Sequence, residues 1–300
     1  MSVILETKLS IPLAYKGKVR DTYKLGNNLL LIATDRISAF DVVLPCGIPD
    51  KGTVLNQIST FWFDKTKHII SNHLITPINT IEELKPYFPD SATVPDYLVG
   101  RSMIVHKAER VPVEAVVRGY ISGSAWAEYL ESGTISGISQ PKGILESQKL
   151  PQALFTPTTK ADSGHDMPMS KKELENLVGK NTALELEEKS LSIYQYALSY
   201  ARSRGIIIAD TKFEFGFING KLALIDEILT PDSSRFWDID KYKVGQSQPS
   251  YDKQPVRDWL EASGWNKEPP APMLPQKIID ETSQRYRTAY KRLVGTELKK

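Results

Sequence analysis

The first third of the chain carries short apolar runs separated by turn residues, a pattern typical of β-strands. Residues 13–45 read as short strands and turns, with Gly26-Asn27-Asn28 as a turn before a buried strand. Apolar residues recur near helical spacing over 58–70, which predicts a helix. The runs that predict individual strands are 29–33, 103–106 and 113–117.

Helical and irregular patterns alternate along the rest of the chain. Helices are predicted from Ser124 onward, over 171–204 before Gly205, and at 256–262 and 278–293. Residues 133–170 are rich in Gly, Ser, Thr and Pro, and such a long irregular stretch is more often a functional loop than a spacer.

These elements predict an α+β protein of two lobes that meet near residue 108. We expect a strand-rich N-terminal lobe at 1–108 and a mixed α/β lobe at 109–300. The terminal helices of the second lobe would occupy about 251–300.

A predicted hairpin after Gly205 holds the most informative pattern. Asp210, Lys212 and Glu214 alternate with Thr211, Phe213 and Phe215. Residues two apart share one face of a strand, so one face carries acid, lysine and acid, and the other carries aromatic rings. We expect the aromatic face to be buried and the charged face to line a cleft or meet water.

The loop length decides which residues of the two strands face each other. The return strand is 221–227, after a turn at Asn219-Gly220. A two-residue loop pairs Phe213 with Asp226, whereas a three-residue loop that includes Ile218 places Lys212 opposite Asp226. We favour the three-residue loop because it keeps a carboxylate away from aromatic side chains.

In that register three carboxylates, Asp210, Glu214 and Asp226, surround Lys212. Such a cluster is costly without a cation, and oxygen ligands without Cys or His favour Mg²⁺. Mg²⁺ held by one or two carboxylates usually accompanies a nucleotide phosphate. A surface hairpin with a solvated face of salt bridges remains the alternative.

Three loops have the composition of anion or polar-ligand sites. Residues 16–21 form a basic, glycine-centred turn, although the Walker A spacing is absent. Residues 118–126 place an arginine and a Ser-Gly-Ser turn before a helix, which favours a phosphate. Residues 35–41 gather two acids, an arginine and a serine. An ordinary basic turn, a serine N-cap and a self-satisfied turn are the respective alternatives.

Composition excludes several classes of protein. The 300 residues include 38 Lys+Arg and 36 Asp+Glu, and this balance disfavours a broad nucleic-acid surface. Apolar stretches such as 29–33 are far shorter than the roughly 20 residues of a membrane-spanning helix. With no secretory signal in MSVILETKLS, we expect a cytoplasmic protein. The single cysteine, Cys46, is expected in the core and excludes an intrachain disulfide.

Several long segments, taken together, resemble the single-function form of the SAICAR synthetases (phosphoribosylaminoimidazole-succinocarboxamide synthases). In chain order they are GKVRD, ATDRISAFD, VPVEAVVRGYISGSAW, FTPTTKAD, IIIADTKFEFG and LIDEILTPDSSRFW. The likeness runs from about residue 14 into the C-terminal helices and includes SYDKQPVRDWL at 250–260.

This resemblance implies both a fold and a reaction. The fold would be two-lobed, with an antiparallel β lobe over a mixed α/β lobe and ATP in the cleft between them. The enzyme would join L-aspartate to the carboxylate of carboxyaminoimidazole ribonucleotide (CAIR) in purine biosynthesis, converting ATP to ADP and phosphate. The implied course is an acyl phosphate on CAIR followed by attack of the aspartate amine. A monomer is expected, acting on these small molecules without nucleic acid or membrane.

The resemblance also implies roles for individual residues. At the reaction centre it places Lys212, Asp210 and Lys160, with His165 and Asp166 in the same loop as Lys160. For ATP it implies phosphate contacts from Lys16, Gly17 and Lys18, adenine contacts along His106, Lys107, Val111 and Glu114, and Mg²⁺ on Glu214 and Asp226. For the CAIR 5′-phosphate it implies Arg118, Ser122, Gly123, Ser124 and Arg235. For the rest of CAIR and for aspartate it implies Asp35, Arg36, Ser38 and Asp41.

Two alternatives use the same nucleotide cleft. One is a small-molecule kinase with a different acceptor, and the other is a nucleotide-binding module without turnover. ADP formation that depends on both CAIR and aspartate would distinguish the ligase from both alternatives.

Overall fold

Five antiparallel strands from the first third of the chain form one sheet. The computed structural model describes residues 3–88, 93–160 and 167–298. In spatial order the strands are β1 (Leu13–Lys16), β2 (Arg20–Leu25), β3 (Asn28–Ala33), β7 (Ser102–His106) and β6 (Leu74–Pro77). Alternate residues such as Tyr23, Leu25, Leu30 and Ile32 form a separate core under this sheet. The strands predicted for this region are confirmed.

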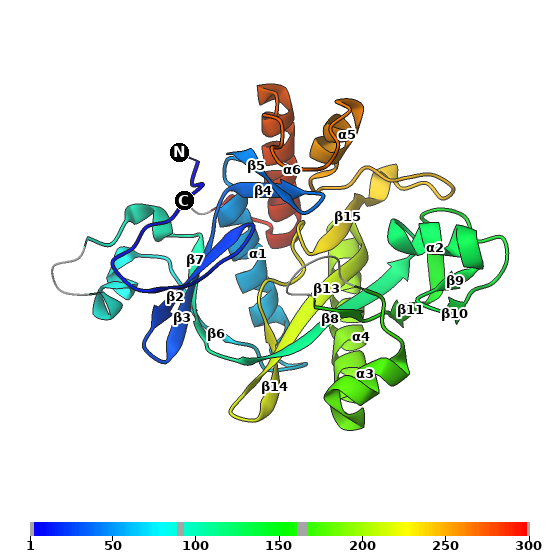
Figure 1. Ribbon diagram of the computed structural model, residues 1–300, viewed down its shortest axis with the longest axis horizontal. Coiled ribbons are helices and arrows are strands. Elements are labelled where there is room, and N and C mark those ends of the chain that lie inside the picture. The colour runs from blue at the N-terminus through cyan, green and yellow to red at the C-terminus, as the bar shows by residue number, and fades with distance from the viewer. Residues whose placement is uncertain (1–2, 89–92, 161–166, 299–300) are drawn as a thin grey trace.

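A six-stranded antiparallel sheet built around two long strands forms the middle of the molecule (Figure 1). Its members are β8 (Glu109–Tyr120), β11 (Lys149–Phe155), β12 (Thr158–Thr159), β13 (Ile206–Ile218), β14 (Lys221–Ile225) and β15 (Ser234–Asp238). On one side β13 pairs with β8. On its other side β13 pairs first with β15 and then with β14, so the strands separate near residues 212–213.

The prediction of a wholly irregular stretch at 133–170 is wrong in part. Besides β11 and β12, it contains the short hairpin strands β9 (Thr134–Ile135) and β10 (Ile138–Ser139). The pairing of β11 with β8 shifts register between Lys149 and Leu154, and Pro151 lies within β11. An irregular strand at the edge of a sheet tolerates proline and loses the period-two pattern, which hid it in the sequence. A second small hairpin joins β4 (Arg36–Ala39) and β5 (Val42–Gly47).

The predicted helices are present with shifted ends. They are α1 (Lys51–Thr66), α2 (Ser124–Ser132), α3 (Lys171–Val178), α4 (Lys180–Arg202), α5 (Gln254–Ala262) and α6 (Gln276–Val294), with short 3-10 turns at Ile81–Glu83, Lys85–Tyr87, Asp96–Leu98 and Ile239–Lys241. The region predicted as one helix divides into α3 and α4 because Gly179 has φ 81°. Among the described residues, no helix has the length and apolar character needed to cross a bilayer.

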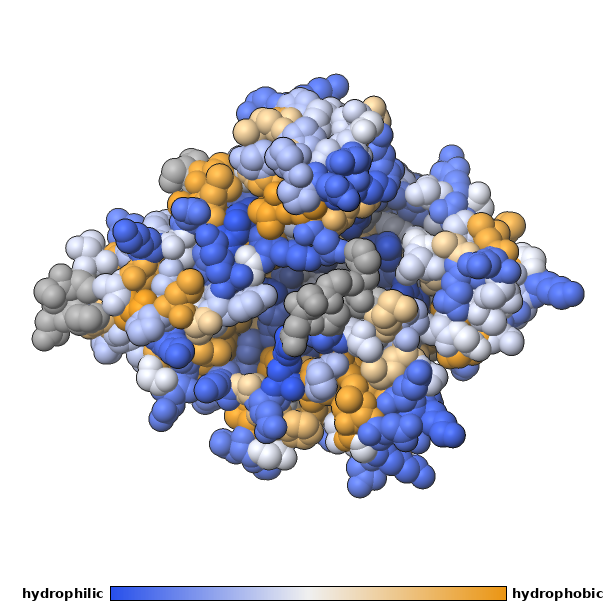
Figure 2. Space-filling view, viewed as in Figure 1, coloured by the Kyte–Doolittle hydropathy of each residue, from blue (hydrophilic) through white to orange (hydrophobic). Residues whose placement is uncertain are grey.

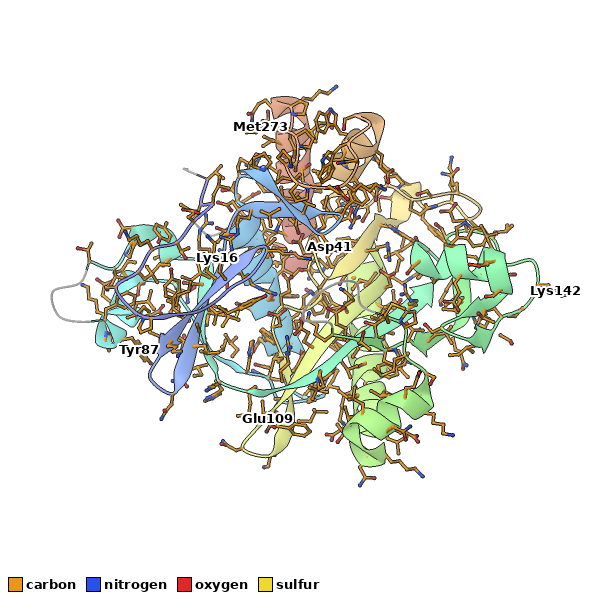
Figure 3. All side chains as sticks on the ribbon, in the orientation of Figure 1. Lys16, Asp41, Tyr87, Glu109, Lys142 and Met273 are labelled. Atoms are coloured by element: carbon orange, nitrogen blue, oxygen red, sulfur yellow. The ribbon has the colours of Figure 1, made fainter. Side chains whose placement is uncertain are left out.

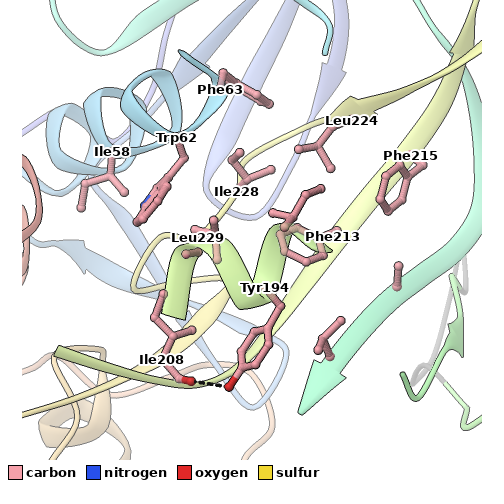
Figure 4. Close-up of a cluster of buried hydrophobic side chains, with 14 of the residues drawn as sticks. Ile58, Trp62, Phe63, Tyr194, Ile208, Phe213, Phe215, Leu224, Ile228 and Leu229 are labelled. Carbon is pink, nitrogen blue, oxygen red and sulfur yellow. Dashed lines mark hydrogen bonds between the residues drawn. The ribbon is translucent and has the colours of Figure 1, made fainter. Parts of the chain in front are cut away.

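The largest core lies between the central sheet and helices α1, α4 and α6 (Figure 4). Phe213 and Phe215 are buried in it, as predicted, and the Tyr194 hydroxyl donates to the Ile208 carbonyl at 2.7 Å. The same core includes Met103 and Val105 of β7, so it extends to the first sheet. The boundary predicted near residue 108 falls in the connection from β7 to β8, and the division into two lobes stays a prediction.

Candidate active site

A cavity of about 340 Å³ opens on the charged face of the central sheet, close to where β15 and β14 separate. Its lining residues are mainly charged or hydroxylated: Glu114, Val116, Arg118, Ser124, Thr158, Asp210, Lys212, Pro231, Asp232, Ser233, Ser234, Arg235, Asp252, Lys253 and Arg257. Figure 2 shows that mostly hydrophilic residues surround the middle of this face. The cavity brings together residues predicted from three separate segments of the sequence.

Two arginines and one aspartate form one corner of this cavity. Asp210 of β13 pairs with Arg118 of β8, whose Nη1 lies 3.3 Å from Asp210 Oδ2. Arg235 of β15 binds the same carboxylate oxygen. The Asp210 charge raises the pKa of Arg235, and burial lowers that of Arg118, yet arginine stays protonated. The corner therefore carries a net positive charge.

The N-terminus of α2 closes this corner. Gly123 precedes the helix with φ 58°, and a Cβ there would lie 2.3 Å from Arg235 Nη2. The Ser124 hydroxyl lies 3.5 Å from Arg118 Nη2, and Ser122 lies half-buried just before. A helix N-terminus with two guanidinium groups is suited to bind a phosphate. We call Arg118, Gly123, Ser124 and Arg235 the anion corner.

A row of alternating acids and lysines continues from the cavity along β8 and β13. Glu114 and Glu214 face each other across the two strands. Lys160 lies 2.7 Å from each carboxylate, and Lys212 lies 2.7 Å from the second oxygen of Glu114. Burial would raise the pKa of Glu114, but Lys212 and Lys160 outweigh it and lower this pKa. Both predicted catalytic lysines are thus held by acids.

The predicted hairpin register is wrong. Ile218 pairs with Lys221 and Glu214 pairs with Ile225, so the loop is the two-residue turn Asn219-Gly220, both with positive φ. Lys212 therefore does not face Asp226. This register does not place the Asp226 carboxylate among the aromatic side chains, as had been expected of it. Asp226 follows the end of β14 with φ 64°, so its backbone turns away from the paired strands.

The three predicted acids consequently form two groups and do not surround Lys212. Asp210 binds the two arginines of the anion corner, whereas Asp226 lies near Glu214. Burial and the Asp226 charge raise the pKa of Glu214 to about 6. Burial also disfavours the Asp226 charge, but Arg20 outweighs it and lowers the Asp226 pKa. No group of three or more His, Cys, Asp or Glu residues in the described ranges is arranged to hold a metal ion.

The basic turn between β1 and β2 lies at one end of the first sheet. The Gly17 amide donates to the Arg20 carbonyl at 2.7 Å, which makes the turn tight. Lys16 at the end of β1 pairs with Glu6 at 3.3 Å, and Lys18 pairs with Asp41 between β4 and β5. Lys16 and Asp41 are labelled in Figure 3. Both lysines are half exposed, so they can exchange these partners for a ligand.

Two residues expected to contact the substrates have their polar groups bound to other parts of the protein. Arg36 is buried, and its five N–H donors bind the Lys18, Leu5 and Gly17 carbonyls and both oxygens of Asp21. Asp35 is buried and binds Arg101 at 3.0 Å. Arg36 therefore fixes the basic turn from beneath. Ser38 is buried in β4, and Asp41 is exposed.

The connection from β7 to β8 carries the residues expected near adenine. His106 and Lys107 are exposed, and Val111 is buried in β8. The His106 amide donates to the His73 carbonyl at 2.8 Å, which fixes the start of this connection. His165 and Asp166 lie outside the described residues.

Several charged residues at the site were not singled out from the sequence. Arg20 binds Asp226, and Lys253 and Arg257 line the cavity. Asp232, also in its lining, pairs with buried Lys51 at 2.8 Å. Arg20 and Lys253 belong to the segments GKVRD and SYDKQPVRDWL, which resemble the family and could have indicated them. Their binding partners could not be inferred, because these lie far away in sequence.

Known proteins of one family resemble this chain along most of its length. Residues 13–272 match the family profile described as SAICAR synthetase. A phosphoribosylaminoimidazole-succinocarboxamide synthase of Thermodesulfovibrio yellowstonii is 53% identical over 98% of this chain and 99% of its own. The synthase of Elusimicrobium minutum is 49% identical over 96% and 97%.

A solved structure has the same fold. The SAICAR synthase of Saccharomyces cerevisiae, complexed with SAICAR, superposes with a TM-score of 0.89 at 43% identity, covering 98% of this chain and 99% of that one. The resemblance found in the sequence is confirmed, and the chain belongs to the SAICAR synthetase family.

Proposed function

We propose that the cavity and the adjoining acid–lysine row perform the SAICAR synthetase reaction in two neighbouring subsites. The chain is an ATP-dependent ligase of this family, which joins L-aspartate to the carboxylate of CAIR and forms ADP and phosphate in purine biosynthesis. The observation that carries the assignment of subsites is the separation of the acids into an arginine-bound group and a lysine-bound group.

The anion corner binds the 5′-phosphate of CAIR. Arg118 and Arg235 supply charge, and Ser122, Gly123 and Ser124 supply hydroxyl and backbone donors at the start of α2. Asp210 holds the two arginines in place. Lys253 and Arg257, which also line the cavity, add positive charge for the remaining anionic groups of the substrates.

ATP lies along the other side of the row. Its phosphates meet Lys16, Gly17 and Lys18, and its adenine lies along His106–Glu114, with Lys107 and Val111 contributing mainly through backbone. The exposure of both lysines of the basic turn supports this placement.

Glu214 and Asp226 would hold Mg²⁺. The Asp226 charge contributes to raising the Glu214 pKa, so the two carboxylates lie close enough to interact, and such oxygen ligands fit a hard cation. When bound, the ion neutralises charge on the ATP phosphates. Lys212 and Lys160 supply the remaining positive charge around the transferred phosphoryl group.

The chemistry has two steps. The CAIR carboxylate attacks the γ-phosphorus of ATP, giving an acyl phosphate and ADP. The neutral amine of aspartate then attacks the acyl carbon, phosphate leaves, and the amide loses a proton. The acyl phosphate must be kept from water until the amine attacks.

The segment at 35–41 shapes the CAIR and aspartate side of the site. Asp35 and Arg36 act from within the protein by fixing backbone, Ser38 is buried as well, and Asp41 is exposed. We place the enzyme in the cytoplasm as a monomer. The buried free thiol of Cys46 supports a reducing compartment.

The test is ADP production by the purified chain with ATP and Mg²⁺, adding CAIR and aspartate singly and together. We expect full ADP formation only with both. ADP formed with CAIR alone at the same rate, without aspartate, would indicate a kinase. ATP binding without turnover would indicate a binding module.

A further inference from the structure

We propose that Arg20 occupies the place of the divalent ion in the metal-free enzyme, neutralising the metal-binding carboxylates until the ion displaces it. This inference rests on the proposed metal role of Glu214 and Asp226. It goes beyond that proposal by giving Arg20 two roles: holding the carboxylates in place and competing with the ion for them.

Arg20 lies between two parts of the chain that are distant in sequence. It is the first residue of β2, and its guanidinium binds the Asp226 carboxylate, 206 residues away. Its Nη1 also lies 3.5 Å from Glu227 Oε1. The side chain is only 21% exposed, so this is a largely desolvated contact.

The charges around Arg20 require a cation. Glu214, Asp226 and Glu227 all interact electrostatically with Arg20. Lys160 partners Glu214, but no described lysine forms an ion pair with Asp226. Desolvated carboxylates in such proximity are unstable unless a positive charge compensates them. Arg20 supplies this charge in the absence of the ion.

The guanidinium of Arg20 occupies the Asp226 oxygen to which it is bonded. A divalent ion therefore reaches that oxygen only if the guanidinium moves away. Glu227 remains within reach as a second acceptor, so Arg20 can leave Asp226 without losing every partner.

The experiment measures Mn²⁺ binding, by electron paramagnetic resonance at pH 8 without nucleotide, to wild type and the variants Arg20→Gln, Arg20→Lys and Asp226→Asn. Lys24→Gln is the matched control. Lys24 lies on the same strand but is exposed, about 13 Å further along it. We expect Arg20→Gln to bind Mn²⁺ about tenfold more tightly, because one competing charge is gone. Arg20→Lys and Lys24→Gln should stay near wild type.

Unchanged or weaker Mn²⁺ binding by folded Arg20→Gln would overturn the inference. Equal binding by wild type and Asp226→Asn would instead reject the metal site itself. If Arg20→Gln does not fold, wild-type crystals soaked in Mn²⁺ decide. An ion at Asp226 with Arg20 turned to Glu227 supports displacement, and an ion at Asp226 with the Arg20–Asp226 contact intact refutes it.

Discussion

Substitution of Gly123 by alanine tests the anion corner most selectively. A Cβ at Gly123 would lie 2.3 Å from Arg235 Nη2, far inside any allowed contact, and the flexible arginine must move. Arg235 would then lose its place beside Asp210 and its contact with the CAIR phosphate. Loss of one hydrogen bond to a charged group costs about 1.5–3 kcal/mol. The KM for CAIR should therefore rise about 10- to 100-fold.

The matched control is Gly133→Ala at the other end of the same helix. Gly133 also has positive φ, 72°, but a Cβ there meets nothing within 4 Å. Both variants carry backbone strain, but the strain is larger at Gly123, which has ψ −131°, than at Gly133, which has ψ 13° in the left-handed helical region, so the melting temperature of Gly133→Ala should fall less. The assay is ADP release with CAIR varied at saturating ATP and aspartate. An unchanged KM for CAIR in Gly123→Ala would refute the anion corner, and a raised KM for ATP instead would show that the two phosphate sites are exchanged.

Three further predictions test the remaining parts of the site. Glu214→Ala should lose most turnover while folding nearly normally, and wild-type kcat with unchanged Mg²⁺ dependence would reject the metal role. Burial and Asp226 raise the pKa of Glu214 from 4.5 to about 6, so its contribution to stability is lost as the pH rises through this range. Glu214→Gln should therefore stabilise the metal-free protein by up to about 2 kcal/mol at pH 8 and by only about 0.4 kcal/mol at pH 4.5, and denaturation showing no gain at pH 8 would contradict this. Arg36→Lys, which loses donors to the basic turn, should raise the KM for ATP about tenfold and leave that for CAIR unchanged. Arg101→Lys, at a buried arginine that does not touch the turn, is the control, and equal effects of both would argue for general destabilisation.

The sequence predicted the faces of the acidic hairpin but not its register. Alternation alone placed Phe213 and Phe215 in the core and the charges opposite them, because the strand period is two. The register depended on where Asp226 could be tolerated. Its positive φ removes it from the ladder, and a local backbone turn of this kind leaves no mark in the hydrophobic pattern.

The ion pairs between residues distant in sequence could not be predicted from the hydrophobic pattern either. Lys160 bridges Glu114 and Glu214, and Arg20 binds Asp226, yet each partner lies on a different strand or loop. Motif resemblance brought most of these residues into the candidate site. It did not reveal that three backbone carbonyls and the Asp21 carboxylate occupy all the donors of Arg36, because burial and partner geometry emerge only from tertiary packing.

The most direct test of the two-subsite arrangement is a crystal structure with CAIR, a non-hydrolysable ATP analogue and Mn²⁺, with anomalous diffraction measured at the manganese edge. We predict the CAIR phosphate between Arg118, Arg235 and the start of α2, and an anomalous peak between Glu214 and Asp226. An anomalous peak beside Asp210, or a nucleotide phosphate in the anion corner, would contradict the account.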